Sequence, residues 1–92
     1  MSRRLLSTAV QIKPAPKDVL LIPRHLLGQV LVPTDAEMRD AIGRCTRDLE
    51  NMRLSRGPTW EADISTLNFS TQLLDTGEVV LRGSVVIERA DG

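Results

Sequence analysis

Hydrophobic and polar residues alternate along the start of the chain. From Leu6 to Ile12 every second residue is apolar or β-branched, and the residues between are small or polar. This is the period of a strand with one buried face, so we expect a strand over residues 4–13. The following KPAPK predicts an extended connector, because each proline removes a backbone donor and restricts the residue before it. Beyond it, DVLLI is typical of a short strand and PRHLLGQ of one helical turn.

The spacing of apolar residues changes to a helical period in the middle of the chain. Thr34 is suited to the N-cap position, and Glu37, three residues later, completes the pattern of a capping box. Gly57 and Pro58 are residues that end a helix. We therefore expect an amphipathic helix over residues 35–55. Its apolar stripe consists of Met38, Ala41, Ile42, Cys45, Leu49 and Met52.

The last third of the chain predicts a β-hairpin. Two β-rich segments, WEADISTLNFSTQLL and EVVLRGSVVIER, flank a turn in which Gly77 suits the left-handed position after a type I turn. In the returning strand, Val80 and Val86 lie on the face opposite to four other aliphatic residues, and Ile64 and Leu74 are expected to join them. The four are Val79, Leu81, Val85 and Ile87.

These elements predict one α+β domain over residues 1–92. Its expected architecture is a two-layer sandwich in which one long amphipathic helix packs on a small, mostly antiparallel sheet. Hydrophobic residues make up 41% of the chain and charged residues 26%, which is typical of a globular domain. Because Trp60 and Phe69 are the only aromatic residues, the core must be largely aliphatic.

The net charge is zero, which gives no general argument for a nucleic-acid or membrane partner. The distribution is uneven, since residues 1–33 carry five basic residues against one acid and residues 60–92 carry six acids against two basic residues. We expect these charges to cancel within one fold, and head-to-tail contact between two copies is the alternative. The segment VLLIPRHLLGQVLV is too short and too interrupted for a membrane span, and the apolar run after the first arginines is too short for an export signal.

Few residues of the chain suggest a catalytic, phosphate-binding or metal-binding site. Cys45 lies in the middle of the apolar stripe, so we expect a buried thiol with no lowered pKa. Every arginine of the helix has an acidic residue within one turn, which is typical of a solvated face and not of a phosphate-binding surface. One cysteine and one histidine provide no metal cluster, and the chain is compatible with the cytoplasm. We expect no cofactor and no enzymatic activity, and a pair of Cys45 with His25 is the least favoured alternative.

The function predicted from these patterns is that of a non-enzymatic protein-binding module. We expect a small homo-oligomeric subunit, with a dimer favoured, that has an assembly or inhibitory role of the kind found in small phage or mobile-element proteins. The identity of a further protein partner is not predicted. The expected contact residues are Leu26, Leu27, Val30, Val32, Val80 and Val86. The alternative is a small nucleic-acid-associated regulator that uses Arg3, Arg4, Lys13 and Lys17.

Overall fold

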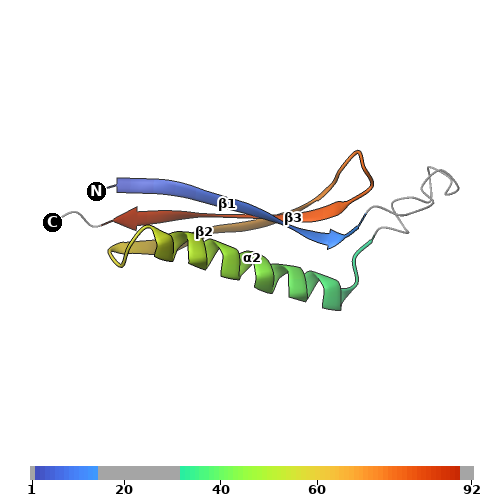
Figure 1. Ribbon diagram of the computed structural model, residues 1–92, viewed down its shortest axis with the longest axis horizontal. Coiled ribbons are helices and arrows are strands. Elements are labelled where there is room, and N and C mark those ends of the chain that lie inside the picture. Colours follow the sequence, from blue (N-terminus) through green and yellow to red (C-terminus); the bar gives the residue numbers. More distant parts are fainter. Residues whose placement is uncertain (1, 15–31, 90–92) are drawn as a thin grey trace, which may run out of the picture.

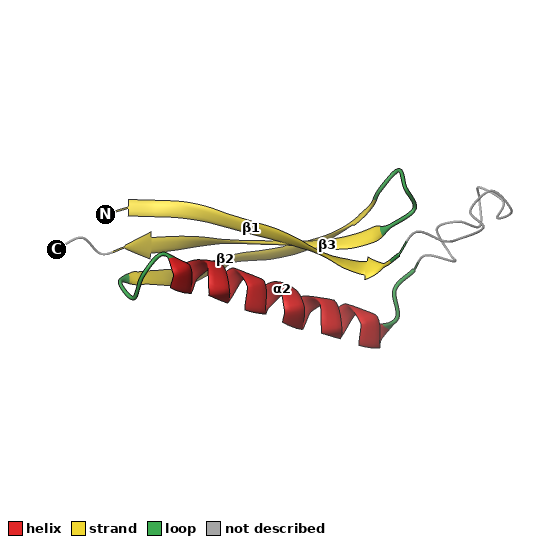
Figure 2. Ribbon diagram, viewed as in Figure 1, coloured by secondary structure: helices red, strands yellow, loops and turns green. Residues whose placement is uncertain are grey.

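One long helix packs on a three-stranded antiparallel sheet (Figure 1). The computed structural model describes residues 2–14 and 32–89. The elements are β1 (Ser2–Lys13), α2 (Asp35–Ser55), β2 (Trp60–Leu73) and β3 (Val79–Arg89). The predicted α+β two-layer architecture is confirmed, and Figure 2 shows the helix along one face of the sheet. The short strand and the helical turn predicted between β1 and α2 lie outside the described residues.

The order of the strands is β1-β3-β2, so β3 occupies the centre and the other two strands form the edges. Both edge strands are antiparallel to β3. Ser2 and Trp60 each pair with Arg89, so β1 and β2 start at the same end of the sheet and run parallel to each other. Residues at matching positions of the two edges therefore lie at the same level along the sheet.

The helix begins and ends where the sequence predicts. The Thr34 hydroxyl accepts a hydrogen bond from the Glu37 backbone N–H at 3.1 Å, and the Glu37 carboxylate accepts one from the Thr34 N–H at 2.9 Å. This capping box satisfies two of the donors that a helix start leaves unpaired. At the other end the Gly57 N–H donates to the Leu54 carbonyl, and Gly57 takes a φ of 119°, which a side chain would disfavour.

The core lies between α2 and the face of the sheet that it covers. From the helix, Ala41, Cys45 and Leu49 are buried. The closest approach occurs at Gly83, where an added Cβ would lie 2.2 Å from the Cys45 Sγ. The missing side chain at Gly83 therefore makes the room that the helix needs. The buried strand residues around this contact are Leu6, Val10, Ile12, Trp60, Val79, Leu81, Val85 and Ile87.

The hairpin turn also has the predicted form. The Gly77 N–H donates to the Leu74 carbonyl at 2.9 Å, and the Leu74 N–H donates to the Glu78 carbonyl at 2.8 Å. Gly77 takes a φ of 88°, as the residue after a type I turn requires.

A bulge in β2 moves one residue from its predicted place. Asp63 pairs with Val86 and Asn68 with Ser84, so residues 64–67 face Val85 alone. Ile64 was predicted on the same face as Val80, and this prediction is wrong because Ile64 lines a groove on the helix side of the sheet. The extra residues reset the alternation of side chains, which a period of two along the sequence cannot reveal.

Candidate functional site

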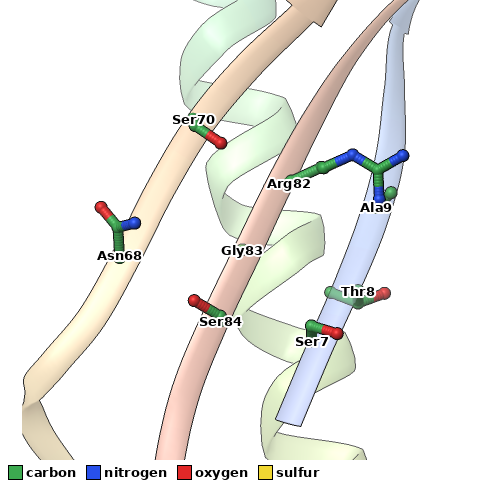
Figure 3. Close-up of a pocket in the computed structure, with 8 residues that line it drawn as sticks. All are labelled: Ser7, Thr8, Ala9, Asn68, Ser70, Arg82, Gly83 and Ser84. Carbon is green, nitrogen blue, oxygen red and sulfur yellow. The ribbon is translucent and has the colours of Figure 1, made fainter. Parts of the chain in front are cut away.

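The face of the sheet turned away from α2 is covered by no other element of the described residues. A shallow hollow of about 430 Å³ crosses all three strands there, and Figure 3 shows it with α2 behind the sheet. The Arg82 Nε donates to the Gln72 side-chain oxygen at 2.7 Å and so ties β3 to β2 on this face. The hollow contains hydroxyl and amide groups and no carboxylate, histidine or cysteine. Its lining residues are Ser7, Thr8, Ala9, Asn68, Ser70, Arg82, Gly83 and Ser84.

Val80 and Val86 lie on this face, as the pattern predicts. Val80 pairs with Gln11 and Gln72, and it is only 8% exposed in the single chain. Val86 is half-buried, so the two valines present less apolar surface than the sequence suggested. Val32 is exposed, whereas the predicted contact residues Leu26, Leu27 and Val30 lie outside the described residues.

Of the four cations of the nucleic-acid alternative, the three within the described residues do not form one surface. Arg3 makes ion pairs with Glu88 and, at 3.7 Å, with Asp63. At the other end of the strand, Lys13 pairs with Glu37 at 3.4 Å. Arg4 is exposed on the opposite face of the strand from Arg3, and Lys17 lies outside the described residues. Part of the basic charge near the start of the chain is thus balanced within the fold.

The two edges of the sheet differ in what they leave exposed. On β1, Leu5 is 69% exposed, and the Gln11 carbonyl accepts a hydrogen bond from the Arg44 guanidinium at 2.8 Å. On β2, two backbone carbonyls accept hydrogen bonds from side chains. The Arg53 guanidinium donates to the Trp60 carbonyl and the Thr66 hydroxyl to the Asp63 carbonyl, both at 2.7 Å. The bulge interrupts β2 further, so β1 is the longer regular edge. Sequence patterns did not single out this edge, because the order of strands decides which strand is outermost.

A second surface feature is a narrow apolar groove between α2 and β2. Ile64, which is 68% exposed, stands at this groove, and Leu49 and Leu67 line it further. Its polar lining residues are Thr46, Glu50 and Arg53. The helix therefore leaves part of the apolar surface of β2 uncovered.

The cysteine has the buried position that the sequence predicts. Cys45 is 0% exposed, and burial, with a smaller effect of the Asp48 charge, raises the pKa of its thiol. A thiol of this kind is protonated at neutral pH and is a poor nucleophile. His25, the other member of the least favoured catalytic pair, lies outside the described residues. Within the described residues no group of three or more His, Cys, Asp or Glu side chains is placed to hold a metal ion.

Among the described elements no helix combines the length and the apolar character that crossing a membrane requires. Comparisons with known proteins give no assignment, since no family model, no curated protein and no solved structure matches the chain. The function must therefore be inferred from the fold and surfaces of the chain itself.

Proposed function

We propose that the chain is a non-enzymatic protein-binding subunit that associates with further copies of itself and serves as an assembly component. The observation that carries the proposal is the one-sided architecture. The helix covers one face of the sheet, while the described residues leave open the other face and, apart from the contact of Arg44 with the Gln11 carbonyl, the β1 edge.

An open strand edge favours contact with another chain. Every second residue of an edge strand turns its backbone N–H and C=O away from the sheet, and these groups can pair with a further strand. β1 is 12 residues long, pairs regularly with β3 from Ser2 to Gln11, and exposes Leu5 beside this row of backbone groups. Natural sheets commonly protect such edges with bulges, and the bulge of β2 interrupts that edge between Asp63 and Asn68 but leaves the stretch from Trp60 to Asp63 regularly paired.

Apolar burial alone gives a modest driving force for this association. Complete burial of an aliphatic side chain contributes about 1.5–3 kcal/mol, whereas association itself costs about 4–15 kcal/mol. Leu5 and the half-buried Val86 are therefore insufficient by themselves. A stable contact must add backbone pairing or complementary charges to them.

Hydrogen exchange over a dilution series tests the proposal. We expect the backbone amides of β1 to exchange more slowly in concentrated than in dilute protein, because association covers them, while those of the central strand β3 change little. If each strand exchanged at the same rate in dilute and in concentrated protein, self-association would be overturned. Retention on heparin that falls steeply with salt would support the nucleic-acid alternative instead.

A further inference from the structure

We propose that copies of the chain associate head to tail, with the basic β1 edge of one copy beside the acidic β2 edge of the next. This inference rests on the proposed self-association and names its geometry. It assigns the partner of β1 as a second copy of the same chain.

The two edges of the sheet carry charges of opposite sign. β1 contains Arg3, Arg4 and Lys13 and no acidic residue. β2 contains Glu61 and Asp63 and no basic residue. Since β3 separates these strands, each copy has a basic edge and an acidic edge on opposite sides of one sheet.

The register of the sheet places these charges at matching levels. Arg3 and Glu61 both pair with Glu88 of the central strand. Two residues further along each edge strand, Leu5 and Asp63 both pair with Val86. If a second copy continues the sheet at its edge, Arg3 of one chain lies level with Glu61 of its neighbour, and Leu5 lies level with Asp63. All four side chains are on the face turned away from the helix, because residues that pair across a sheet share a face.

Glu61 is the carboxylate that such a neighbour would neutralise. It stands directly opposite Glu88, a like-charge pair that is unfavourable across two strands. Arg3 of the same chain pairs with Glu88 and Asp63. Among the described residues Glu61 makes no ion pair within 4 Å, and the cation that its charge affects is Arg53 of the same chain, whose pKa it helps to raise. A neighbouring Arg3 would lie between its own Glu88 and the incoming Glu61, so the repulsion on this face would be compensated from outside the chain.

The helix layer fits the same arrangement. Arg44 reaches the Gln11 carbonyl of β1, which places the flank of α2 that carries Arg44 and Asp48 over that edge. The opposite flank, with Glu50 and Arg53, borders the groove that leaves Ile64 exposed. A copy added at the β2 edge would bring its own α2, lying above its β1, next to this groove. The contact would then cover apolar surface as well as join opposite charges.

A symmetric pairing of two β1 edges fits the charges less well. It would bring together two strands that each carry three cations and no acid. Arg3 and Lys13 already have acidic partners on their own chain, which reduces the repulsion, but a symmetric pairing adds no attraction between opposite charges. A head-to-tail contact uses two different surfaces, and its repetition gives a ring or a filament of more than two copies.

Two substitutions at Leu5 test this geometry. Leu5→Glu places a negative charge level with the neighbour's Asp63, and Leu5→Lys places a positive charge there. Both remove the same exposed leucine, so the second variant is the control for lost apolar contact. Sedimentation velocity at low salt should show weaker assembly for Leu5→Glu than for Leu5→Lys, with a dissociation constant on the order of tenfold higher. The difference should shrink at about 1 M salt, where exposed charges are screened.

A third variant separates folding from association. Glu61→Gln removes the repulsion with Glu88 and the attraction to Arg53 together, without adding a cation, so its unfolding midpoint should stay close to that of the wild type, while its assembly should weaken. Assembly that is identical in both Leu5 variants, or weaker for Leu5→Lys than for Leu5→Glu, would overturn the head-to-tail arrangement and leave self-association standing. A wild type that stays monomeric under the same conditions would overturn both proposals.

Discussion

Gly83→Ala tests the contact that sets the distance between helix and sheet. The new Cβ would lie 2.2 Å from the Cys45 Sγ and 3.1 Å from two carbons of the Phe69 ring. Non-bonded atoms normally approach to about 3.5–4.0 Å, so the sulfur and the new methyl group would have to move apart by more than an ångström. Gly83 and Cys45 are both buried at the contact between helix and sheet, so this movement would have to push α2 and β3 apart and disturb the core around them.

The direction of the stability change distinguishes this steric clash from the intrinsic preference of a strand for alanine over glycine. An alanine within a strand is normally favoured over glycine by roughly 0.5–1 kcal/mol. Overfilling a packed core costs typically about 1–3 kcal/mol. We therefore expect Gly83→Ala to lower the free energy of unfolding by about 1–3 kcal/mol. In a Cys45→Ala background, where the sulfur is absent, the same substitution should change it by less than about 1 kcal/mol, which gives a clear coupling between the two sites.

Urea unfolding at a fixed protein concentration measures the free energy of unfolding of the wild type, the two single variants and the double variant. Trp60 is the only tryptophan and is 6% exposed when folded, so its fluorescence reports unfolding. Gly43→Ala is the matched control, because a Cβ there has no neighbour within 4 Å and should stabilise the helix by roughly 0.8–1.0 kcal/mol. An equal loss of stability for Gly83→Ala with and without the Cys45 sulfur would refute the packing argument.

Three further predictions concern the helix and its cysteine. Thr34→Ala should lower the free energy of unfolding by about 0.5–2 kcal/mol in thermal melts, because it removes the capping hydroxyl, whereas Thr34→Ser should keep most of the stability. The Thr34 backbone N–H, with a smaller effect of Lys13, lowers the pKa of Glu37 from its ordinary 4.5, so its contribution to stability is present above 4.5 and is lost as the pH falls through the lower folded value. Glu37→Gln should therefore lose less stability on acidification in urea titrations, and a wild-type acid profile would contradict this. Iodoacetamide should leave Cys45 unmodified in the native protein and alkylate it after unfolding, and fast native labelling would show that the thiol is accessible.

Local signals in the sequence predicted most of the secondary structure. The Thr34 and Glu37 pair fixed the start of the helix, and Gly77 fixed the turn of the hairpin, because each acts within a few residues of the chain. The period of the apolar residues identified the buried stripe around Cys45 for the same reason. Such signals need no knowledge of the rest of the fold.

Features that depend on contacts between distant parts of the chain could not be predicted from these local signals. The bulge in β2 depends on pairing with β3, and it puts Ile64 and Leu67 on the same side of the sheet, which alternation counted back from Leu67 does not give. The nearly complete burial of Val80 depends on Gln11 and Gln72 from two other strands. The strand order also decides that basic β1 and acidic β2 occupy opposite edges, so the surfaces of the proposed head-to-tail contact could be identified only from the folded sheet.

Native mass spectrometry of the wild-type chain tests the central claim, self-association, most directly. At low salt and micromolar concentration we expect masses that are multiples of the 10.2 kDa chain, with the larger species decreasing on dilution. A single species of 10.2 kDa at every concentration would contradict the account.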